Sequence, residues 1–224
     1  MLALQRTPEW HKERRGKITA SVCGTILGVN KNQTPHVLWE QLVGVKPAFK
    51  GNYFTWWGTK NEPNALNEYM HQTMADVVEV GFVQHRNYGW LGGSPDGLVG
   101  DDGVVEFKCP RAKMYTDDTI PLQYYVQCQV LLEVTDRTWC DLFVWKPDEC
   151  CVWRFGRDTA FFEAICSTLA IFHAHMSRPE QPPPPTPITT MAMREFTTIS
   201  MKEHMQCVPD MHTHSPFSKR KITT

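Results

Sequence analysis

The chain has 224 residues, of which 42% are hydrophobic and 21% are charged, and its formal net charge is −1 at pH 7. This length predicts one globular domain with a sizeable core, and the near-zero net charge excludes a protein that holds nucleic acid by overall charge alone. No apolar run approaches the roughly 20 residues that cross a bilayer, and the first residues, MLALQRTPEW, lack the apolar core of a signal peptide. We therefore expect an intracellular protein without a membrane partner, whose eight scattered cysteines are reduced and mostly buried.

Four helices are predicted in the first third of the chain. They share helix-start residues or helical spacing of apolar residues, and they cover residues 7–17, 19–29, 36–44 and 62–74. Thr19 or Ser21 caps the second of them. Pro63 fits the first turn of the fourth, which places Glu62 at the mouth of that helix.

The middle of the chain predicts strands and helices in alternation. Strands are expected at residues 77–85, 88–100, 103–109, 138–147 and 150–156, and helices at residues 121–134 and 158–176. This order predicts an α/β domain over residues 1–178, with a mixed central β-sheet flanked by helices. The proline-rich stretch RPEQPPPPTP then predicts a disordered C-terminal tail over residues 179–224.

The stretch GSPDGLVGDDGVVEFKCP, Gly93 to Pro110, concentrates the charged residues that could carry chemistry. Glu106 and Lys108 are two residues apart on a predicted strand, so both side chains point to the same face. One reading is a surface hairpin with a solvated ion pair. The other is a carboxylate site formed with Asp96, which would need a divalent cation between the acidic groups. These residues alone leave both readings open.

The segments SPDG…VEFKCP resemble the Pro-Asp…(Asp/Glu)-x-Lys motif of the restriction-endonuclease-like nuclease superfamily. The segments EWHKERRGKITAS, WGTKNEPNALNEY and LQYYVQCQVLLEVTDRTWCDLFVW extend this resemblance, in order, to the phage lambda exonuclease family, also called the YqaJ-type viral recombinases. The resemblance covers about residues 6–175 and implies a restriction-endonuclease-like core. The predicted tail, residues 179–224, is not part of this resemblance.

The resemblance implies a metal site. Asp96 and Glu106 match the metal ligands, the main-chain carbonyl of Phe107 is a further ligand, and Glu62 matches an upstream acidic residue that is a ligand or its neighbour. Lys108 matches the lysine that orients the attacking water or stabilises charge on the phosphate. The implied cofactor is Mg²⁺, with Mn²⁺ as a substitute.

The resemblance also implies contacts with DNA. Arg14 matches an arginine that binds the 5′-phosphate, Ser21 a serine beside it, and Tyr124 and Gln127 lie on the helix that lines the site. Each has an ordinary explanation too: a solvated basic helix for Arg14, a helix cap for Ser21, and plain helix positions for the other two.

The implied function is 5′ to 3′ exonuclease digestion of linear double-stranded DNA in recombination or repair. Implied partners are DNA ends, a single-strand annealing protein and further copies of the chain in a trimer, with the nucleus as a compartment in a eukaryotic host. A non-catalytic DNA-binding scaffold and an endonuclease of the same superfamily are the alternatives. An iron–sulfur nuclease is disfavoured because the sequence contains no CxxC pair.

Overall fold

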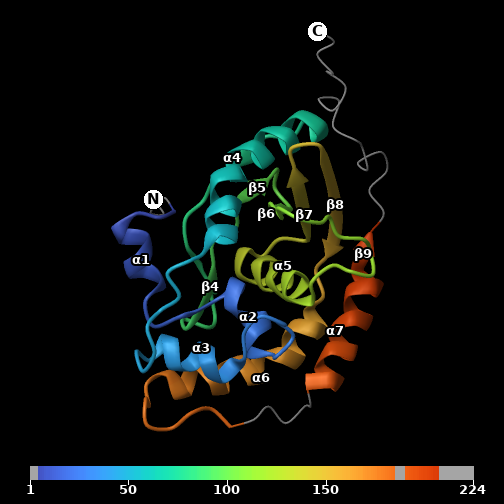
Figure 1. Ribbon diagram of the computed structural model, residues 1–224. Helices are drawn as coiled ribbons and strands as arrows, with labels where there is room; N and C mark the ends of the chain where they lie inside the picture. Colours follow the sequence, from blue (N-terminus) through green and yellow to red (C-terminus); the bar gives the residue numbers. More distant parts are fainter. Residues whose placement is uncertain (1–4, 185–189, 207–224) are drawn as a thin grey trace.

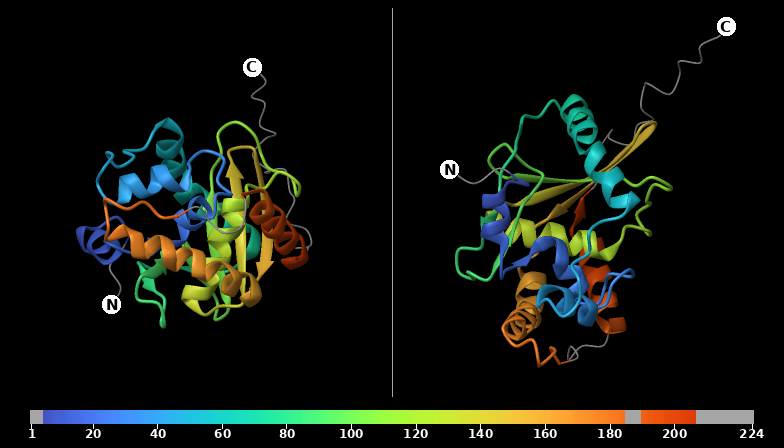
Figure 2. Two further views of the ribbon diagram at one scale, coloured as in Figure 1. Left: turned by 90° about the horizontal axis from the view of Figure 1, so that it is seen from below. Right: turned by 60° about the vertical axis from the view of Figure 1, so that its left-hand side comes forward.

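The computed structural model describes residues 5–184 and 190–206 and shows a mixed β-sheet with helices on both faces (Figures 1 and 2). The main sheet has six strands in the order β2-β5-β6-β7-β8-β9, and a smaller sheet has the order β1-β4-β3. The strands of the main sheet are β2 (Val77–Val78), β5 (Gly97–Val99), β6 (Gly103–Lys108), β7 (Trp139–Lys146), β8 (Glu149–Gly156) and β9 (Met205–Gln206). Those of the small sheet are β1 (Ile18–Thr19), β3 (Val83–Gln84) and β4 (Leu91–Gly93).

The main sheet is antiparallel except between β6 and β7, which are parallel. A parallel pair needs a crossover connection, and helix α5 (Leu122–Thr135) supplies it. Helix α4 (Tyr53–Thr73) packs against β6 and β7 on one face of the sheet, and α5 covers the other face (Figure 2). Strand β6 is therefore buried on both faces, which removes the surface-hairpin reading of Glu106.

The remaining helices are α1 (Pro8–Arg14), α2 (Ala20–Ile26), α3 (Pro35–Leu42), α6 (Thr159–Met176) and α7 (Thr190–His204). Their starts follow capping chemistry: the side chains of Thr7, Thr34 and Asp158 each accept a hydrogen bond from the first turn of α1, α3 and α6. Thr19 occupies the capping position of α2, but its side chain makes no capping hydrogen bond.

Helix α4 begins at Tyr53, nine residues earlier than the predicted start at residue 62. Asn52 and Thr55 form a capping box at its start, and Pro63 lies inside the helix. Proline at this interior position removes one helical hydrogen bond, a cost that the packing of α4 on the sheet offsets. Glu62 is consequently a mid-helix residue on the same side as buried Ala65, one turn later, rather than a residue at the helix mouth.

The expectation of a disordered tail is wrong for residues 190–206. Helix α7 buries Met193, Thr197, Ser200 and Met201, a helical spacing that the surrounding polar residues hide in the sequence. Its end continues into β9, which pairs with β8. Residues 185–189 and 207–224 of the predicted tail lie outside the described residues.

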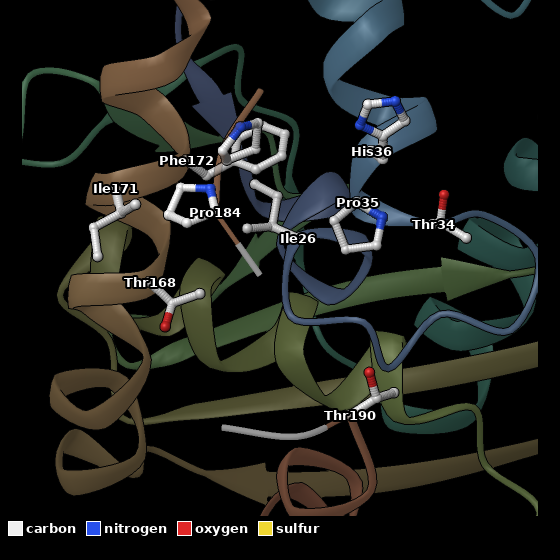
Figure 3. A pocket seen from close by; sticks show the side chains of 10 residues that line it. Ile26, Thr34, Pro35, His36, Thr168, Ile171, Phe172, Pro184 and Thr190 are labelled. Atoms are coloured by element: carbon white, nitrogen blue, oxygen red, sulfur yellow. The ribbon is translucent and has the colours of Figure 1, made fainter. Parts of the chain in front are cut away.

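A cavity of about 350 Å³ lies among α2, α3, α6 and the start of α7 (Figure 3). Its walls are mainly apolar, with Ile26, Pro35, Ile171 and Phe172 among them. It contains none of the residues to which the sequence assigns chemistry.

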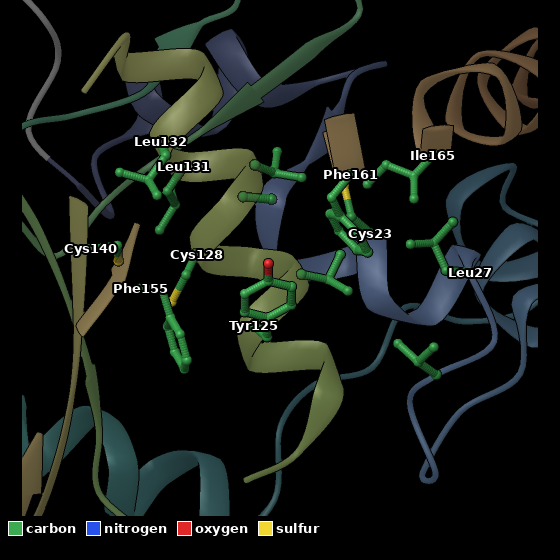
Figure 4. Close-up of a cluster of buried hydrophobic side chains, with 14 of the residues drawn as sticks. Cys23, Leu27, Tyr125, Cys128, Leu131, Leu132, Cys140, Phe155, Phe161 and Ile165 are labelled. Atoms are coloured by element: carbon green, nitrogen blue, oxygen red, sulfur yellow. The ribbon is translucent and has the colours of Figure 1, made fainter. Parts of the chain in front are cut away.

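The largest core surrounds α5, where Tyr125 packs edge-to-face against Phe155 and Phe161 (Figure 4). All but one of the seven cysteines that the structure describes are buried, as expected, and the exception is Cys166. None of the described helices is both long and apolar enough to cross a membrane.

Candidate active site

Strands β5 and β6 bring Asp96 and Glu106 together. Asp96 immediately precedes β5, whose first residue, Gly97, is paired with Val105 of β6. The Asp96 carboxylate accepts a hydrogen bond of 2.7 Å from the main-chain N–H of Phe107, the residue after Glu106. The backbone pairing of two adjacent strands therefore fixes both carboxylates at one end of the sheet.

Glu106 lies within a network that leaves one of its oxygens unpaired. The side chains of Lys108 and Gln127 both donate to Glu106 Oε1, each at 2.6 Å, and Lys108 Nζ also donates to Gln127 Oε1 at 3.2 Å. Glu106 is only 4% exposed, yet its buried Oε2 has no hydrogen-bond partner within the part of the chain that the structure describes. Because buried polar atoms are nearly always paired, this oxygen is suited to bind a ligand that the protein itself does not supply.

The charges of the site perturb one another. Burial and the neighbouring carboxylate of Glu106 raise the pKa of Asp96 well above its ordinary value. Burial alone would lower the pKa of Lys108, but Glu106, Tyr124 and Asp96 raise it, so Lys108 stays protonated. Two close carboxylates that share one lysine form a site where a divalent cation would be favourable.

Glu62 lies on α4, which covers the face of the sheet opposite to α5, and its side chain approaches the site from there. Its side chain is 32% exposed and forms an ion pair with Arg6, and burial raises its pKa against the opposing effect of Arg6. No three Asp, Glu, His or Cys side chains are already gathered as a metal cage within residues 5–184 and 190–206. The donors nevertheless fit a hard cation, because the unpaired Glu106 oxygen, Asp96 and the Glu62 carboxylate are oxygen ligands.

Arg14 is held beside the segment that precedes β5 by contacts with two side chains. Its guanidinium lies 4.0 Å from the centre of the Trp10 ring, one helical turn earlier, and donates to Ser94 Oγ at 3.3 Å. Trp10 Nε1 donates to the same oxygen at 2.9 Å. Ser94 is two residues before Asp96, so Arg14 lies close to the candidate metal ligands.

Ser21 has a less defined place. It is exposed in the first turn of α2, and its hydroxyl lies 3.2 Å from that of Thr19. The structure does not give it the capping role.

A groove of about 990 Å³ opens beside Lys108 and Glu62. Lys108 Nζ lies 4.9 Å from the centre of the Tyr124 ring, which forms part of the wall. Further along, the groove is lined by basic and aromatic side chains that follow or face β6: Arg111, Lys113, Tyr115, Phe49 and Phe54. It shares no residue with the apolar cavity of Figure 3.

The structure thus brings together Asp96, Glu106, Phe107, Lys108 and Gln127, with Tyr124 and Glu62 at the edges. Arg14 is linked to the segment before Asp96 through Ser94. Sequence reasoning missed four residues that complete this arrangement: Arg6, Trp10, Ser94 and Arg111. A helical spacing of four residues between Trp10 and Arg14 was a usable signal for one of them. Arg6 pairs with a residue 56 positions away, and no local pattern indicates this contact.

Comparison with known proteins identifies the family and related chains. Residues 9–138 match the family described as YqaJ-like viral recombinase domain. Protein YqaJ of Bacillus subtilis is 30% identical over 132 residues, which cover 56% of this chain and 41% of that protein. Protein R354 of Acanthamoeba polyphaga mimivirus is 26% identical over 173 residues, covering 69% of this chain and 32% of that protein. The matched segments thus span about a third to two fifths of these two relatives.

Two solved structures resemble the fold over most of their length. An alkaline exonuclease, LHK-Exo, from Laribacter hongkongensis has 30% sequence identity and a TM-score of 0.66, with 76% of this chain and 93% of that chain covered. A phage related exonuclease from Haemophilus somnus 129PT has 13% identity and a TM-score of 0.57, covering 84% of this chain and 96% of that chain, and supports the fold alone. The predicted fold class is confirmed by these similarities.

Proposed function

The chain belongs to the family of YqaJ-like viral recombinase domains, and on this basis we propose that it is a metal-dependent exonuclease of linear double-stranded DNA. The observation that carries the proposal is Glu106, a buried carboxylate with one oxygen fixed by Lys108 and Gln127 and the other without a partner. Most buried side-chain polar atoms in proteins are hydrogen-bonded, so the unpaired oxygen of Glu106 is available to a ligand.

Asp96, Glu106 and the main-chain carbonyl of Phe107 would hold Mg²⁺, or Mn²⁺ in its place, with Glu62 as a further ligand. The bound ion would lower the pKa of a water molecule and neutralise negative charge that builds on the phosphate. The N–H of Phe107 fixes the orientation of the Asp96 carboxylate, and Gln127 fixes that of Glu106. These contacts hold the carboxylates in place before the substrate arrives, which reduces the cost of reorganisation during the reaction.

Lys108 has a role that follows from its charge. Because Glu106, Tyr124 and Asp96 raise its pKa, Lys108 favours the protonated form, which donates hydrogen bonds. It is suited to donate hydrogen bonds to a phosphate oxygen as negative charge increases there. In this hydrolysis the water oxygen forms a bond to phosphorus, and the bond from phosphorus to the 3′ oxygen of the preceding sugar breaks. The leaving oxygen ends as a hydroxyl, and the new end carries a 5′-phosphate.

The groove beside Lys108 supplies a path for a nucleic-acid strand. Arg111 and Lys113 provide positive charge for phosphates, and Tyr115, Phe54 and Tyr124 provide ring faces for bases. This local arrangement explains how a chain with net charge −1 would bind DNA.

Arg14 favours the 5′-phosphate as the feature recognised at the DNA end. A terminal phosphate carries close to two negative charges at pH 7, against one for an internal diester. The planar guanidinium can bind two of its oxygens at once, and Trp10 and Ser94 hold the group in place.

The test is a cleavage assay on linear duplex DNA labelled separately at each end, with 5′-phosphate or 5′-hydroxyl termini, and on closed circular DNA. We expect Mg²⁺-dependent digestion from 5′-phosphorylated ends, slower digestion from hydroxyl ends and very slow cutting of closed circles. Arg14→Gln should remove the preference for phosphate, whereas Arg15→Gln, a change at the exposed neighbouring arginine, should keep it. Rapid cutting of circles would indicate an endonuclease, and DNA binding without cleavage would indicate a scaffold protein.

A further inference from the structure

A pocket of about 300 Å³ lies beside Glu62, does not include Lys108 in its lining, and is bordered by the N-terminal segment (residues 5 and 6). Arg6 and Glu62 both line this pocket, together with Asp96 and Phe107 of the candidate metal site. The guanidinium of Arg6 and the carboxylate of Glu62 form an ion pair here. A positively charged side chain therefore already contacts one of the proposed ligands.

The N-terminal segment is tied to the body of the protein on this side. The side-chain amide of Gln5 donates to the carbonyl of Pro95 at 2.8 Å and to that of Val80 at 3.1 Å. Arg6 itself has a φ of 68°, in the left-handed region that residues other than glycine rarely adopt. Such a conformation costs energy and persists only where surrounding contacts hold it.

The charge of the site indicates what Arg6 replaces. The three carboxylates of Asp96, Glu106 and Glu62 carry three negative charges when ionised, and Lys108 supplies one positive charge, committed to Glu106. A divalent cation together with Lys108 balances these three charges. Arg6 would then be in excess, and repulsion between the guanidinium and the cation would oppose their binding to one carboxylate.

We propose that Arg6 and the metal ion compete for the Glu62 carboxylate, so that the N-terminal segment sets the metal concentration at which the site fills. This inference rests on the proposed function, because it takes Glu62 as a metal ligand. Arg6 is 55% exposed, so the pair is partly screened by solvent and an incoming cation can displace it.

The test is a titration of the full chain with Mn²⁺ in the absence of DNA. Binding is measured as the decrease in the electron paramagnetic resonance signal of the free ion. In low salt, Arg6→Gln should bind Mn²⁺ about two- to fivefold more tightly than wild type, the range expected from removing an exposed ion pair. Arg6→Lys keeps the charge and should bind like wild type. Arg178→Gln removes a charge from an exposed arginine outside the pocket lining and is the matched control.

Added salt provides a second readout. In 0.5 M NaCl the difference between Arg6→Gln and wild type should shrink, because screening weakens an exposed ion pair. Equal or weaker binding by Arg6→Gln, with wild type binding Mn²⁺ normally, would overturn the competition and leave the proposed function standing. A wild type that binds no Mn²⁺ at millimolar concentration would contradict both.

Discussion

Replacing Lys108 with methionine should destabilise the fold and abolish cleavage. Glu106 is only 4% exposed, and Lys108 and Gln127 both donate hydrogen bonds to its carboxylate. The change removes the donor on Lys108 and leaves the donor on Gln127. Breaking a buried ion pair by removing one partner costs about 3–5 kcal/mol. Because the Lys108 side chain is 21% exposed, we expect a smaller loss in the free energy of unfolding, about 2–3 kcal/mol.

Such a loss corresponds to a melting temperature lower by roughly 4–12 °C for a chain of this size. The pKa of Lys108 is raised in the folded protein, so its contribution is present below the ordinary lysine pKa and is lost only as pH rises through the raised value. The difference between wild type and Lys108→Met should therefore be the same at pH 7 and pH 9, while Mg²⁺ binding is largely retained.

The assay is urea unfolding of the two proteins in parallel with single-turnover cleavage. Lys113→Met is the matched control, because Lys113 is exposed and lines the same groove, and its unfolding free energy should change by less than about 0.5 kcal/mol. The reasoning is refuted if Lys108→Met cleaves DNA at the wild-type rate, or if it is no less stable than Lys113→Met.

Three further predictions follow from buried polar and apolar contacts. Asp96→Asn should abolish cleavage yet melt at a higher temperature than wild type at pH 8 in a chelator. Folding raises the pKa of Asp96, so its ionised carboxylate destabilises the fold at pH values above the ordinary aspartate pKa, and the difference in melting temperature should shrink toward pH 4. A difference that stays the same across this pH range would contradict the prediction. Tyr69→Phe removes a 2.7 Å hydrogen bond to buried Asp141 and should lower the free energy of unfolding by about 1.5–3 kcal/mol in urea titration; no change would show that this bond contributes nothing. Met193→Ala should cost about 2–4 kcal/mol by calorimetry, and a cost near zero would mean that α7 does not pack on the core.

The central strands and their site were predictable because local sequence and structure agree there. Val104 to Lys108 form one strand, and the period of two places Glu106 and Lys108 on one side, where they contact each other. The starts of α1, α3 and α6 were predictable within one residue from their capping residues and the apolar spacing that follows. The strands of two or three residues were too short for their pattern to define their bounds.

Other features depend on contacts between distant segments. Pro63 lies within α4 because the part of the helix that follows it packs on the sheet through Ala65 and Tyr69, which outweighs the local preference of proline for a first turn. Helix α7 is stabilised by contacts such as the 2.6 Å hydrogen bond from Ser200 to Asp158, which no pattern within residues 190–206 reveals. The pairing of Arg6 with Glu62 likewise follows from the fold and not from spacing.

The most direct test of the central claim is the single-turnover rate of 5′-phosphorylated duplex digestion as a function of Mg²⁺, for wild type and Glu106→Gln. Glutamine keeps the shape of the side chain but removes the charge from the buried Glu106 carboxylate, whose Oε2 has no hydrogen-bond partner among the described residues. The account predicts that the wild-type rate depends on Mg²⁺ and that the rate of Glu106→Gln is lower by at least about a hundredfold. Glu9→Gln, a change at an exposed glutamate of α1, should cleave at the wild-type rate. Cleavage by Glu106→Gln at the wild-type rate, or wild-type cleavage that persists in a chelator, would contradict it.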